Sequence, residues 1–224
     1  MKKLIYSTVL LFVAALGNHL NAQETEVSSF NTGDNLLNIG ISPFTYAYGS
    51  AYYSYTNYSA GMTMPPVTVN LQHGFNDFVS AGLTYGRFGR YYKWENPIYG
   101  TSYIEKYKST YTYSLFGVVG EFHYAKLLDE IGFTDGISEK ADLYVGVIIG
   151  ALQSKWKDKN QEYIYNYTTS QYELRVMESS SSSSGGIFRS YAGGRYYFSP
   201  NFGGFIEMGY SGFGYLTLGL TFKM

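Results

Sequence analysis

The chain has 224 residues, 16 Lys and Arg against 17 Asp and Glu, a formal net charge of −1, and no cysteine. This near-neutral balance excludes the strongly basic surface by which proteins bind nucleic acid. Without cysteine there are neither disulfides nor thiolate chemistry, so stability must come from backbone hydrogen bonds and packing. The 26 Tyr, 15 Phe and 26 Gly, set against 15% charged residues, are typical of a protein rich in strands and turns.

The N-terminus has the pattern of an export signal. Lys2 and Lys3 precede an apolar run over residues 4–16, and Ala22 is a small residue that suits the position before a cleavage site. The alternative is a membrane anchor, but a helix that spans a bilayer needs roughly 20 apolar residues. We therefore expect a signal peptide over residues 1–22.

Period-two alternation of apolar and polar residues recurs in about eight segments of the remaining chain. We expect strands over residues 36–44, 66–73, 78–88, 110–124, 141–154, 187–198, 204–210 and 214–224. The turns GFND (74–77) and SPNFG (199–203) are tight, 125–140 is a connection of moderate length, and 45–65, 89–109 and 155–186 are predicted as long loops. The serine run 179–184 cannot bury enough apolar surface to order itself, which predicts a mobile loop tip.

All the long connections fall at the same end of an up-and-down meander. Transmembrane barrels have short periplasmic turns and longer extracellular loops, so both chain ends are expected on the periplasmic side. The chain is thus predicted to be all-β, an antiparallel up-and-down transmembrane β-barrel of about eight strands. A short periplasmic N-terminal tail over 23–35 leads into a barrel domain over 36–224.

The strands of a soluble sandwich or lipocalin-like barrel also alternate between apolar and polar residues. The residues on the second, less apolar face of the strands therefore distinguish these folds from a membrane barrel. That face carries Gly, Thr, Ser and Tyr with few charges, which suits a crowded barrel interior rather than a solvated surface. Aromatic residues near the strand ends are typical of the girdles at a membrane interface. They are Tyr85, Phe88, Phe122, Tyr124, Tyr196, Phe198 and Phe222. Together the two features favour a membrane-spanning barrel.

Charged residues on the second face must be paired, because an isolated buried charge is costly. If Phe198 faces Gly204 across the SPNFG turn, Arg195 lies opposite Glu207, and directly opposed side chains are roughly 5 Å apart. Glu121 has the same inward parity and is expected to join them across the lumen. We interpret Arg195, Glu207 and Glu121 as a structural charge cluster, with a proton or substrate relay as the alternative.

Residues 193–224, GGRYYFSPNFGGFIEMGYSGFGYLTLGLTFKM, resemble the last three strands of small, porin-like outer-membrane β-barrel proteins of Gram-negative bacteria. The segments GEFHYA (120–125) and DLYVGVIIG (142–150) are similar as well. The resemblance implies location in the cell outer membrane and a final strand read by the barrel-insertion machinery. The family usually closes on an aromatic residue, whereas this chain closes on Met224, which weakens the expected recognition signal.

No catalytic or metal site is predicted. His73 and His123 are separate and have no cysteine beside them, so a zinc site is not expected, and no G-x-S-x-G motif is present. His123 beside Glu121 is interpreted as a rim hydrogen bond rather than a base with its orienting group. We expect no enzyme activity and no cofactor; the alternative of a lipid-modifying barrel requires a His with an acidic partner at the long-loop end.

The predicted loops are rich in Tyr and Trp, which present large contact areas at low ordering cost. The candidate extracellular contacts are Tyr91, Tyr92, Trp94, Trp156, Tyr163 and Tyr165. The predicted function is a structural or surface-binding role, with a narrow small-solute channel as the alternative. The expected partners are membrane lipid, lipopolysaccharide, the insertion machinery and an extracellular ligand of unknown identity, and no nucleic acid.

Overall fold

A computed structural model describes residues 29–45 and 58–224 of the chain. The strands are β1 (Asn35–Thr45), β2 (Ser59–Asn76), β3 (Val79–Pro97), β4 (Ile104–His123), β5 (Ala141–Asn166), β6 (Gln171–Ser199), β7 (Phe202–Gly209) and β8 (Gly214–Lys223). Between β4 and β5 lie the helix α2 (Ala125–Glu130) and the 3-10 helix η1 (Ile137–Glu139). The predicted signal peptide, 1–22, and most of the predicted loop 45–65 lie outside the described residues.

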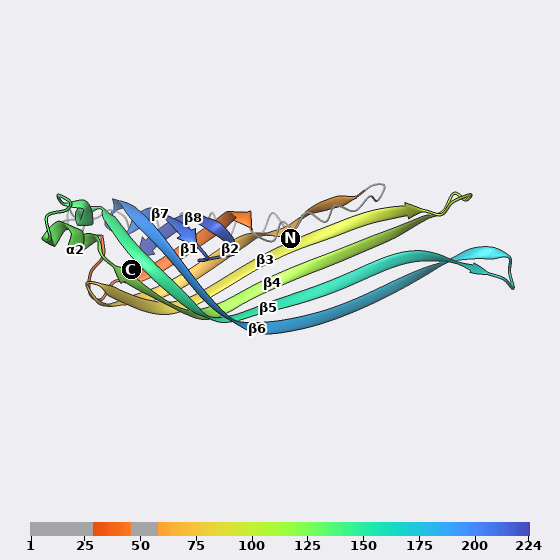
Figure 1. Cartoon of the computed structure of the whole chain (residues 1–224), viewed down its shortest axis with the longest axis horizontal. Helices are drawn as coiled ribbons and strands as arrows, with labels where there is room; N and C mark the ends of the chain where they lie inside the picture. The colour runs from red at the N-terminus through yellow and green to blue at the C-terminus, as the bar shows by residue number, and fades with distance from the viewer. Residues whose placement is uncertain (1–28, 46–57) are drawn as a thin grey trace.

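The strands form one closed antiparallel barrel in sequence order, in which β1 also pairs with β8 (Figure 1). The predicted fold class is confirmed. Closure leaves the barrel body without a sheet edge. Among the residues described, no helix is both long and apolar enough to cross a membrane.

The central strands are much longer than the alternation pattern predicted. β3, β4, β5 and β6 have 19, 20, 26 and 29 residues, whereas β1, β7 and β8 have 11, 8 and 10. The prediction of long loops over 89–109 and 155–186 was wrong, because β3 pairs with β4 as far as Pro97 and Ile104, and β5 pairs with β6 as far as Asn166 and Gln171. Polar, tyrosine-rich sequence hides these strands from a pattern that relies on apolar alternation.

The serine run was also predicted wrongly. Residues 179–184 belong to β6 and pair one by one with residues 153–158 of β5. A strand needs no apolar burial of its own where a neighbouring strand already offers a ladder of backbone donors and acceptors. Composition therefore misled the prediction at this segment.

We call residues 87–97, 104–114, 153–166 and 171–184 of β3–β6 the extension. It projects beyond the barrel body as a curved sheet, at the end opposite α2 (Figure 1). Its two tips are the short connections 98–103 and 167–170. The long-connection end of the meander is thus built mainly from strands.

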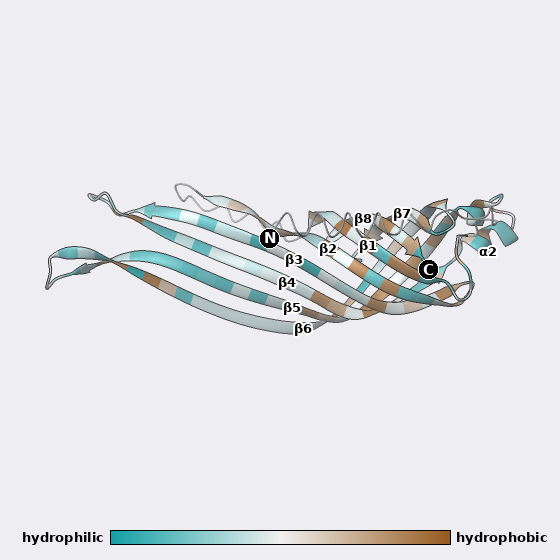
Figure 2. Cartoon of the chain, turned by 180° about the vertical axis from the view of Figure 1, so that it is seen from behind, coloured by the Kyte–Doolittle hydropathy of each residue, from teal (hydrophilic) through white to brown (hydrophobic). Residues whose placement is uncertain are grey.

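The two faces of the strands have opposite character. Leu83, Ile149 and Met208 point outward and are 65%, 61% and 67% exposed, while Thr217 and Thr221 point inward and are fully buried. Hydrophobic residues gather on the barrel body, and the extension is mainly hydrophilic (Figure 2). A folded protein leaves such a continuous apolar belt exposed only where lipid or another apolar partner covers it.

The barrel interior is filled by aromatic and aliphatic side chains that lie against glycines of neighbouring strands. A side chain at Gly219 would collide with the Phe205 ring, and one at Gly146 would collide with the ring of Tyr191. Phe88 is also inside, 2% exposed and packed with Leu115 and Phe213, so its prediction as a girdle residue was wrong. The inner-face glycines thus leave the space that these large rings occupy.

The connection between β4 and β5 is held at the α2 end by one carboxylate. Asp129 accepts hydrogen bonds from Thr134 Oγ1 at 2.6 Å and from the backbone N–H groups of Ile137 and Ser138 at 3.1 and 2.8 Å. These bonds, led by that from Thr134, hold the pKa of Asp129 well below its usual range. The moderate connection predicted over 125–140 is therefore a compact cap rather than a free loop.

Candidate functional site in the barrel interior and the extension

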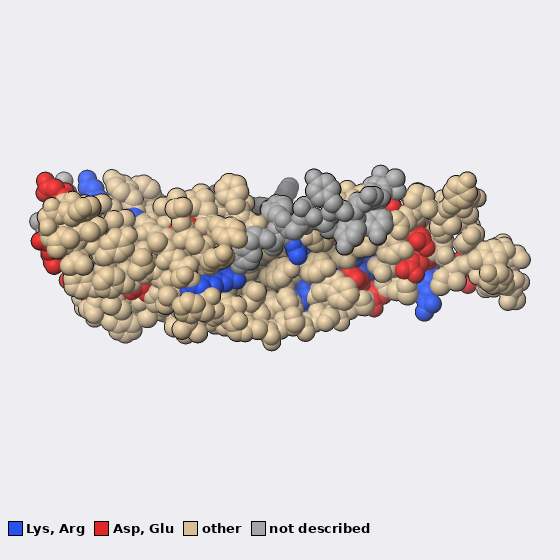
Figure 3. Space-filling view, in the orientation of Figure 1, with Lys and Arg blue, Asp and Glu red and all other residues tan. Residues whose placement is uncertain are grey.

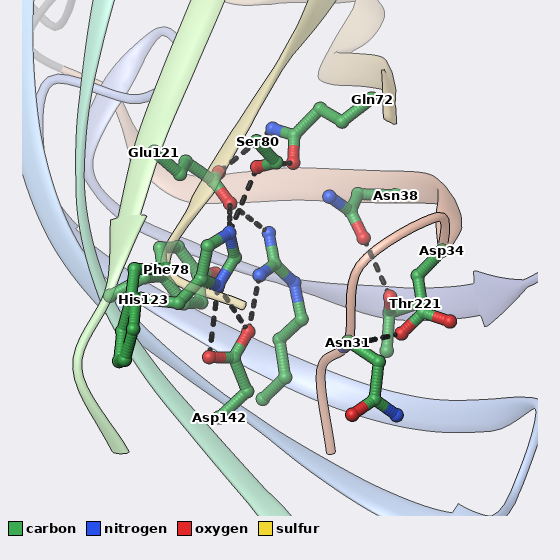
Figure 4. A network of polar contacts seen from close by, with 12 residues as sticks. Asn31, Asp34, Asn38, Gln72, Phe78, Ser80, Glu121, His123, Asp142 and Thr221 are labelled. Carbon is green, nitrogen blue, oxygen red and sulfur yellow. Dashed lines mark hydrogen bonds and ion pairs between the residues drawn. The ribbon is translucent and has the colours of Figure 1, made fainter. Parts of the chain in front are cut away.

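A charge cluster lies inside the barrel near the α2 end. Arg195 of β6 donates from Nη2 to Glu121 Oε2 of β4 at 2.5 Å and from Nη1 to Asp142 Oδ2 of β5 at 2.7 Å. All three residues are buried, and the guanidinium carbon lies 3.8 Å from the centroid of the Tyr144 ring. Figure 4 shows Glu121 and Asp142 converging from two strands. Two carboxylates thus face one cation that is shielded from water.

The predicted register of β6 and β7 was wrong. Arg195 pairs with Phe205, and Glu207 lies opposite Gly193, because a register shift separates the pairs at Tyr197 and Ser199. The prediction assumed that Phe198 faces Gly204, whereas the turn pairs Ser199 with Phe202, one residue away from that register. The irregularity at Tyr197 and Ser199 displaces the register by one residue more. Glu207 instead accepts a hydrogen bond from Tyr144 Oη at 3.0 Å. Glu121, the third residue of the predicted cluster, does form an ion pair with Arg195.

Several cluster members were missed by sequence reasoning. Glu121 Oε1 accepts from Gln72 Nε2 at 2.9 Å and from Tyr191 Oη at 2.6 Å. Asp142 lies directly opposite Arg195 in the β5–β6 ladder. The alternation of the sequence did place Asp142 on the polar, inward face of its strand. It did not give the register between β5 and β6, because residues 155–186 were predicted as a loop.

Ser80, His123 and Asp142 have the spacing of a nucleophile, a base and an orienting acid. His123 Nε2 lies 2.9 Å from Ser80 Oγ, and His123 Nδ1 lies 2.9 Å from Asp142 (Figure 4). However, Ser80 is fully buried, and Asp142 is shared with Arg195. The geometry therefore resembles a triad but offers no access for a substrate in this conformation. The predicted rim hydrogen bond between His123 and Glu121 was wrong, because His123 Nε2 lies 3.9 Å from Glu121 Oε2.

The described part of the predicted tail, residues 29–34, packs against this end of the barrel. The Phe30 ring stacks on His123 with ring centroids 3.6 Å apart and is 2% exposed. Ser29 N–H donates to Ser138 O at 3.0 Å, and Lys126 Nζ donates to Asn31 Oδ1 at 2.8 Å. This segment therefore covers His123, which contacts Asp142 of the charge cluster.

Acidification is expected to loosen residues 29–34. Asp77 in the β2–β3 turn accepts from the hydroxyl and the backbone N–H of Thr32, and these bonds, with one from Lys126, lower its pKa from 3.8 to about 2. Because the pKa of the folded state is depressed, the contact is complete above pH 3.8 and is lost as the pH falls through about 2. The NMR shift of the Thr32 amide should follow this transition, and Asp77→Asn should remove it.

The inner face of the extension is aromatic. Trp94 stacks on Tyr107 with centroids 5.4 Å apart and an interplanar angle of 6°. The Arg90 guanidinium lies 5.2, 5.1 and 5.6 Å from the ring centroids of Tyr92, Tyr111 and Tyr113. Trp156 lies opposite Tyr111. This face continues the barrel interior outward as a tyrosine- and tryptophan-rich surface.

The outer face of the extension is basic. Lys93 pairs with Lys108, and Lys108 pairs with Lys159, so three lysines form one row across β3, β4 and β5. Like charges directly opposite one another in a sheet are destabilising. Only Lys159, at the end of the row, has an ion pair in the described parts of the chain, with Glu178 at 2.8 Å, and this pair lowers the pKa of Glu178. Figure 3 shows charged side chains along the extension and broad uncharged areas over the barrel body.

The predicted contact residues lie on extended strands rather than in loops. Tyr92, Trp94 and Trp156 belong to the inner aromatic face, whereas Tyr91 is on the outer face with Lys93 Nζ 5.1 Å from its ring centroid. Tyr163 packs on Tyr103 near the tip, with centroids 4.7 Å apart. Tyr165 packs on Tyr167 and Tyr172 there, at 5.1 and 5.2 Å. The structure brings these residues onto one projecting sheet but not into one pocket.

Within residues 29–45 and 58–224, no group of three or more His, Cys, Asp or Glu side chains has the arrangement to hold a metal ion. The acidic side chains of the interior are instead engaged by Arg195, Gln72, Tyr191 and Tyr144.

No family model and no curated protein matches the chain. Among solved structures, the chain is similar to the N-terminal β-barrel domain of Pseudomonas aeruginosa OprF, at 12% identity and a TM-score of 0.38, over 87% of this chain and 98% of that one. It is also similar to Ail, the attachment invasion locus protein of Yersinia pestis, in complex with the heparin analogue sucrose octasulfate. That match has 13% identity and a TM-score of 0.39, over 86% of this chain and 96% of that one.

Proposed function

We propose that this chain is an integral outer-membrane β-barrel of a Gram-negative bacterium, and that its extension has a surface-binding role outside the cell. The outward apolar belt supports insertion in a bilayer, because its side chains have no protein neighbour that covers them. The buried charge cluster has a structural role, since it neutralises the polar groups that fill the closed interior. In this proposal the α2 end faces the periplasm and the extension faces the outside of the cell.

The extension is the observation that carries this proposal. A barrel that served only to span the membrane needs strands of about 9–11 residues. β1 and β8 have that length, with 11 and 10 residues, and β7 is one residue shorter than this range, with 8. β5 and β6 exceed it by more than a factor of two, with 26 and 29 residues. The added length carries a face of aromatic residues, which are enriched at interfaces. Its other face carries lysines, which attract partners of opposite charge. Its partners are lipopolysaccharide, close to the membrane, and an extracellular ligand, while the insertion machinery reads β8.

Insertion in a membrane is tested by electrophoresis of the purified protein. A folded transmembrane barrel is expected to migrate as a compact species without heating and more slowly after boiling, because its hydrogen-bonded ladder resists detergent. Identical mobility in the two conditions, or a monodisperse folded protein in water without detergent, contradicts the proposal. The assay needs no knowledge of a ligand.

Ligand binding is tested with the two tryptophans of the chain, Trp94 and Trp156, which both lie on the extension. Their fluorescence therefore reports on this surface alone. A panel of glycans and purified lipopolysaccharide is expected to include a ligand that shifts the emission, and Trp94→Phe with Trp156→Phe serves as the blank. If no member of the panel or of a surface-protein pull-down binds, the recognition role is contradicted.

A narrow channel is the second candidate, because polar residues line the interior. Arg195, Glu121 and Asp142 form buried ion pairs in the lumen, and Phe30 covers the neighbouring His123, so we expect no conductance from the intact barrel in planar bilayers. Replacing Arg195 with Ala is expected to open a small leak. A conductance of the unmodified protein equal to that of this variant favours the channel over a purely surface role.

A further inference from the structure

The β6 strand has an open edge along the extension. β5 pairs with β6 from Gln171 to Tyr196, whereas β7 pairs with it only from Tyr191 to Ser199. In the part of the chain that the structure describes, no strand lies on the other side of β6 between Gln171 and Phe188. Figure 1 shows β6 as the margin of the projecting sheet.

The backbone groups that face this open edge are identified by two hydrogen bonds. Tyr197 N–H donates to Lys140 O on the β5 side, and Ser190 O accepts from Tyr210 N–H on the opposite side. Hydrogen-bonding direction alternates along a strand of an antiparallel sheet, and the β5–β6 register has no shift from Tyr196 to Gln171. The even-numbered residues of β6 therefore direct their N–H and C=O groups to the open edge.

Natural sheets usually block such an edge with proline, a bulge, a charged side chain or a short strand. The edge of β3 follows this rule, since only Trp94–Pro97 extends past its last pairing with β2 and the strand ends in Pro97. The edge of β6 does not, because residues 179–186, SSSSSSGG, contain no proline and no charge, and no bulge. An unblocked edge is the template on which an added strand forms.

Side chains of the neighbouring strand β5 determine which side chains of an added strand would bind favourably on each face of the sheet. On the outer face, Ser182 lies opposite Lys155 and Ser180 lies opposite Lys157. Because serine is short, each lysine of β5 can extend over it toward a strand added beyond β6. Lys155 has no ion pair among the described residues, and Lys157 shares Glu178 with Lys159. On the inner face, Ser181 lies opposite Trp156, which is half-buried.

We propose that the open edge of β6 binds an extended peptide segment of a partner protein by strand addition, with acidic side chains on the outer face and aromatic side chains on the inner face. The acidic side chains pair with Lys155 and Lys157, and an aromatic one packs on Trp156. Main-chain hydrogen bonds to the even-numbered residues of β6 supply the part of the affinity that does not depend on the sequence of the peptide. This inference rests on the proposed surface-binding role and names the partner class of the extension.

The test uses the full-length barrel in lipid nanodiscs and a labelled peptide of alternating Glu and Tyr, about eight residues long, a usual strand length. We expect fluorescence anisotropy to show saturable binding that weakens with salt. A peptide of alternating Lys and Tyr is expected to bind at least about tenfold more weakly, because it faces the lysines with like charge. Equal affinity of the two peptides overturns the assignment of an acidic partner.

A proline pair separates strand addition from simple charge attraction. Ser182→Pro removes an N–H that faces the open edge, so the β5–β6 ladder should persist while affinity for the acidic peptide falls at least about tenfold. Ser181→Pro removes an N–H that β5 uses and is expected to disturb the hairpin itself, which infrared amide bands detect. Unchanged peptide binding by Ser182→Pro, with its ladder intact, overturns the proposal.

Two further measurements distinguish failure of the strand-addition proposal from failure of the proposed surface-binding function. Lys155→Gln with Lys157→Gln should reduce affinity for the acidic peptide severalfold and flatten its salt dependence, while glycan binding, if present, persists on the aromatic face. Sedimentation in detergent tests the other occupant of the edge: a dimer of the barrel that Ser182→Pro abolishes, with no peptide binding, assigns the edge to a second copy and overturns the proposal.

Discussion

Replacing Arg195 with Met is expected to destabilise the barrel by about 3–5 kcal/mol, the usual cost of removing one partner from a buried ion pair. Glu121 and Asp142, both buried, would then face each other's charge without the guanidinium that lies 2.5 and 2.7 Å from them. The measurement is the urea midpoint of unfolding of the protein in lipid vesicles.

The control is Arg175→Met, an exposed arginine of β6 near the tip of the extension, which should leave the midpoint nearly unchanged. A triple variant, Arg195→Met with Glu121→Gln and Asp142→Asn, should recover part of the stability, because the two carboxylates that face the missing guanidinium are then neutral. A single Arg195→Met variant as stable as the parent protein would show that the cluster has no structural role.

Replacing Leu218 with Arg is the second change with a large expected effect. Leu218 lies on the outer face of β8 and is 44% exposed, in register with Ile41 of β1 and Ile206 of β7. A cation at the bilayer midplane costs roughly 2–4 kcal/mol. Refolding into vesicles is expected to be slower and less complete, as measured by the fraction of the compact species on an unheated gel.

The adjacent residue supplies the matched control. Thr217 is fully buried, and its hydroxyl lies 3.0 Å from Ser42 Oγ and accepts from Ser211 Oγ at 2.9 Å. Thr217→Ser keeps these hydrogen bonds and should refold as the parent does. If Leu218→Arg refolds equally well, the outward face of β8 does not contact hydrocarbon.

Alternation was sufficient to predict the barrel and the direction of its side chains. Along β8 the leucines at 218 and 220 point outward and the threonines at 217 and 221 point inward, as the period of two requires. The same parity placed Arg195 and Glu121 inside. These features depend only on the geometry of a single strand, which the local sequence encodes.

Pairing across strands was less accessible. The pairing of Ser199 with Phe202 at the SPNFG turn and the irregularity beside it together place Glu207 opposite Gly193 and not opposite Arg195. The second carboxylate partner of Arg195, Asp142, is separated from it in the chain by the whole β5–β6 hairpin. The length of that hairpin was itself missed, because residues 155–186 are mainly polar and show no regular apolar alternation. A polar strand forms because it can hydrogen-bond to the backbone of a neighbouring strand. The local sequence pattern contains no information on that neighbour.

The sequence by itself determined the class of this protein, the order of its strands and which side chains face inward, because a strand alternates with a period of two whatever it pairs with. Only the tertiary structure decided the partners of Arg195, the covering of His123 by Phe30 and the open edge of β6. These depend on register and strand length, and both are set by hydrogen bonding between segments that lie far apart in the chain.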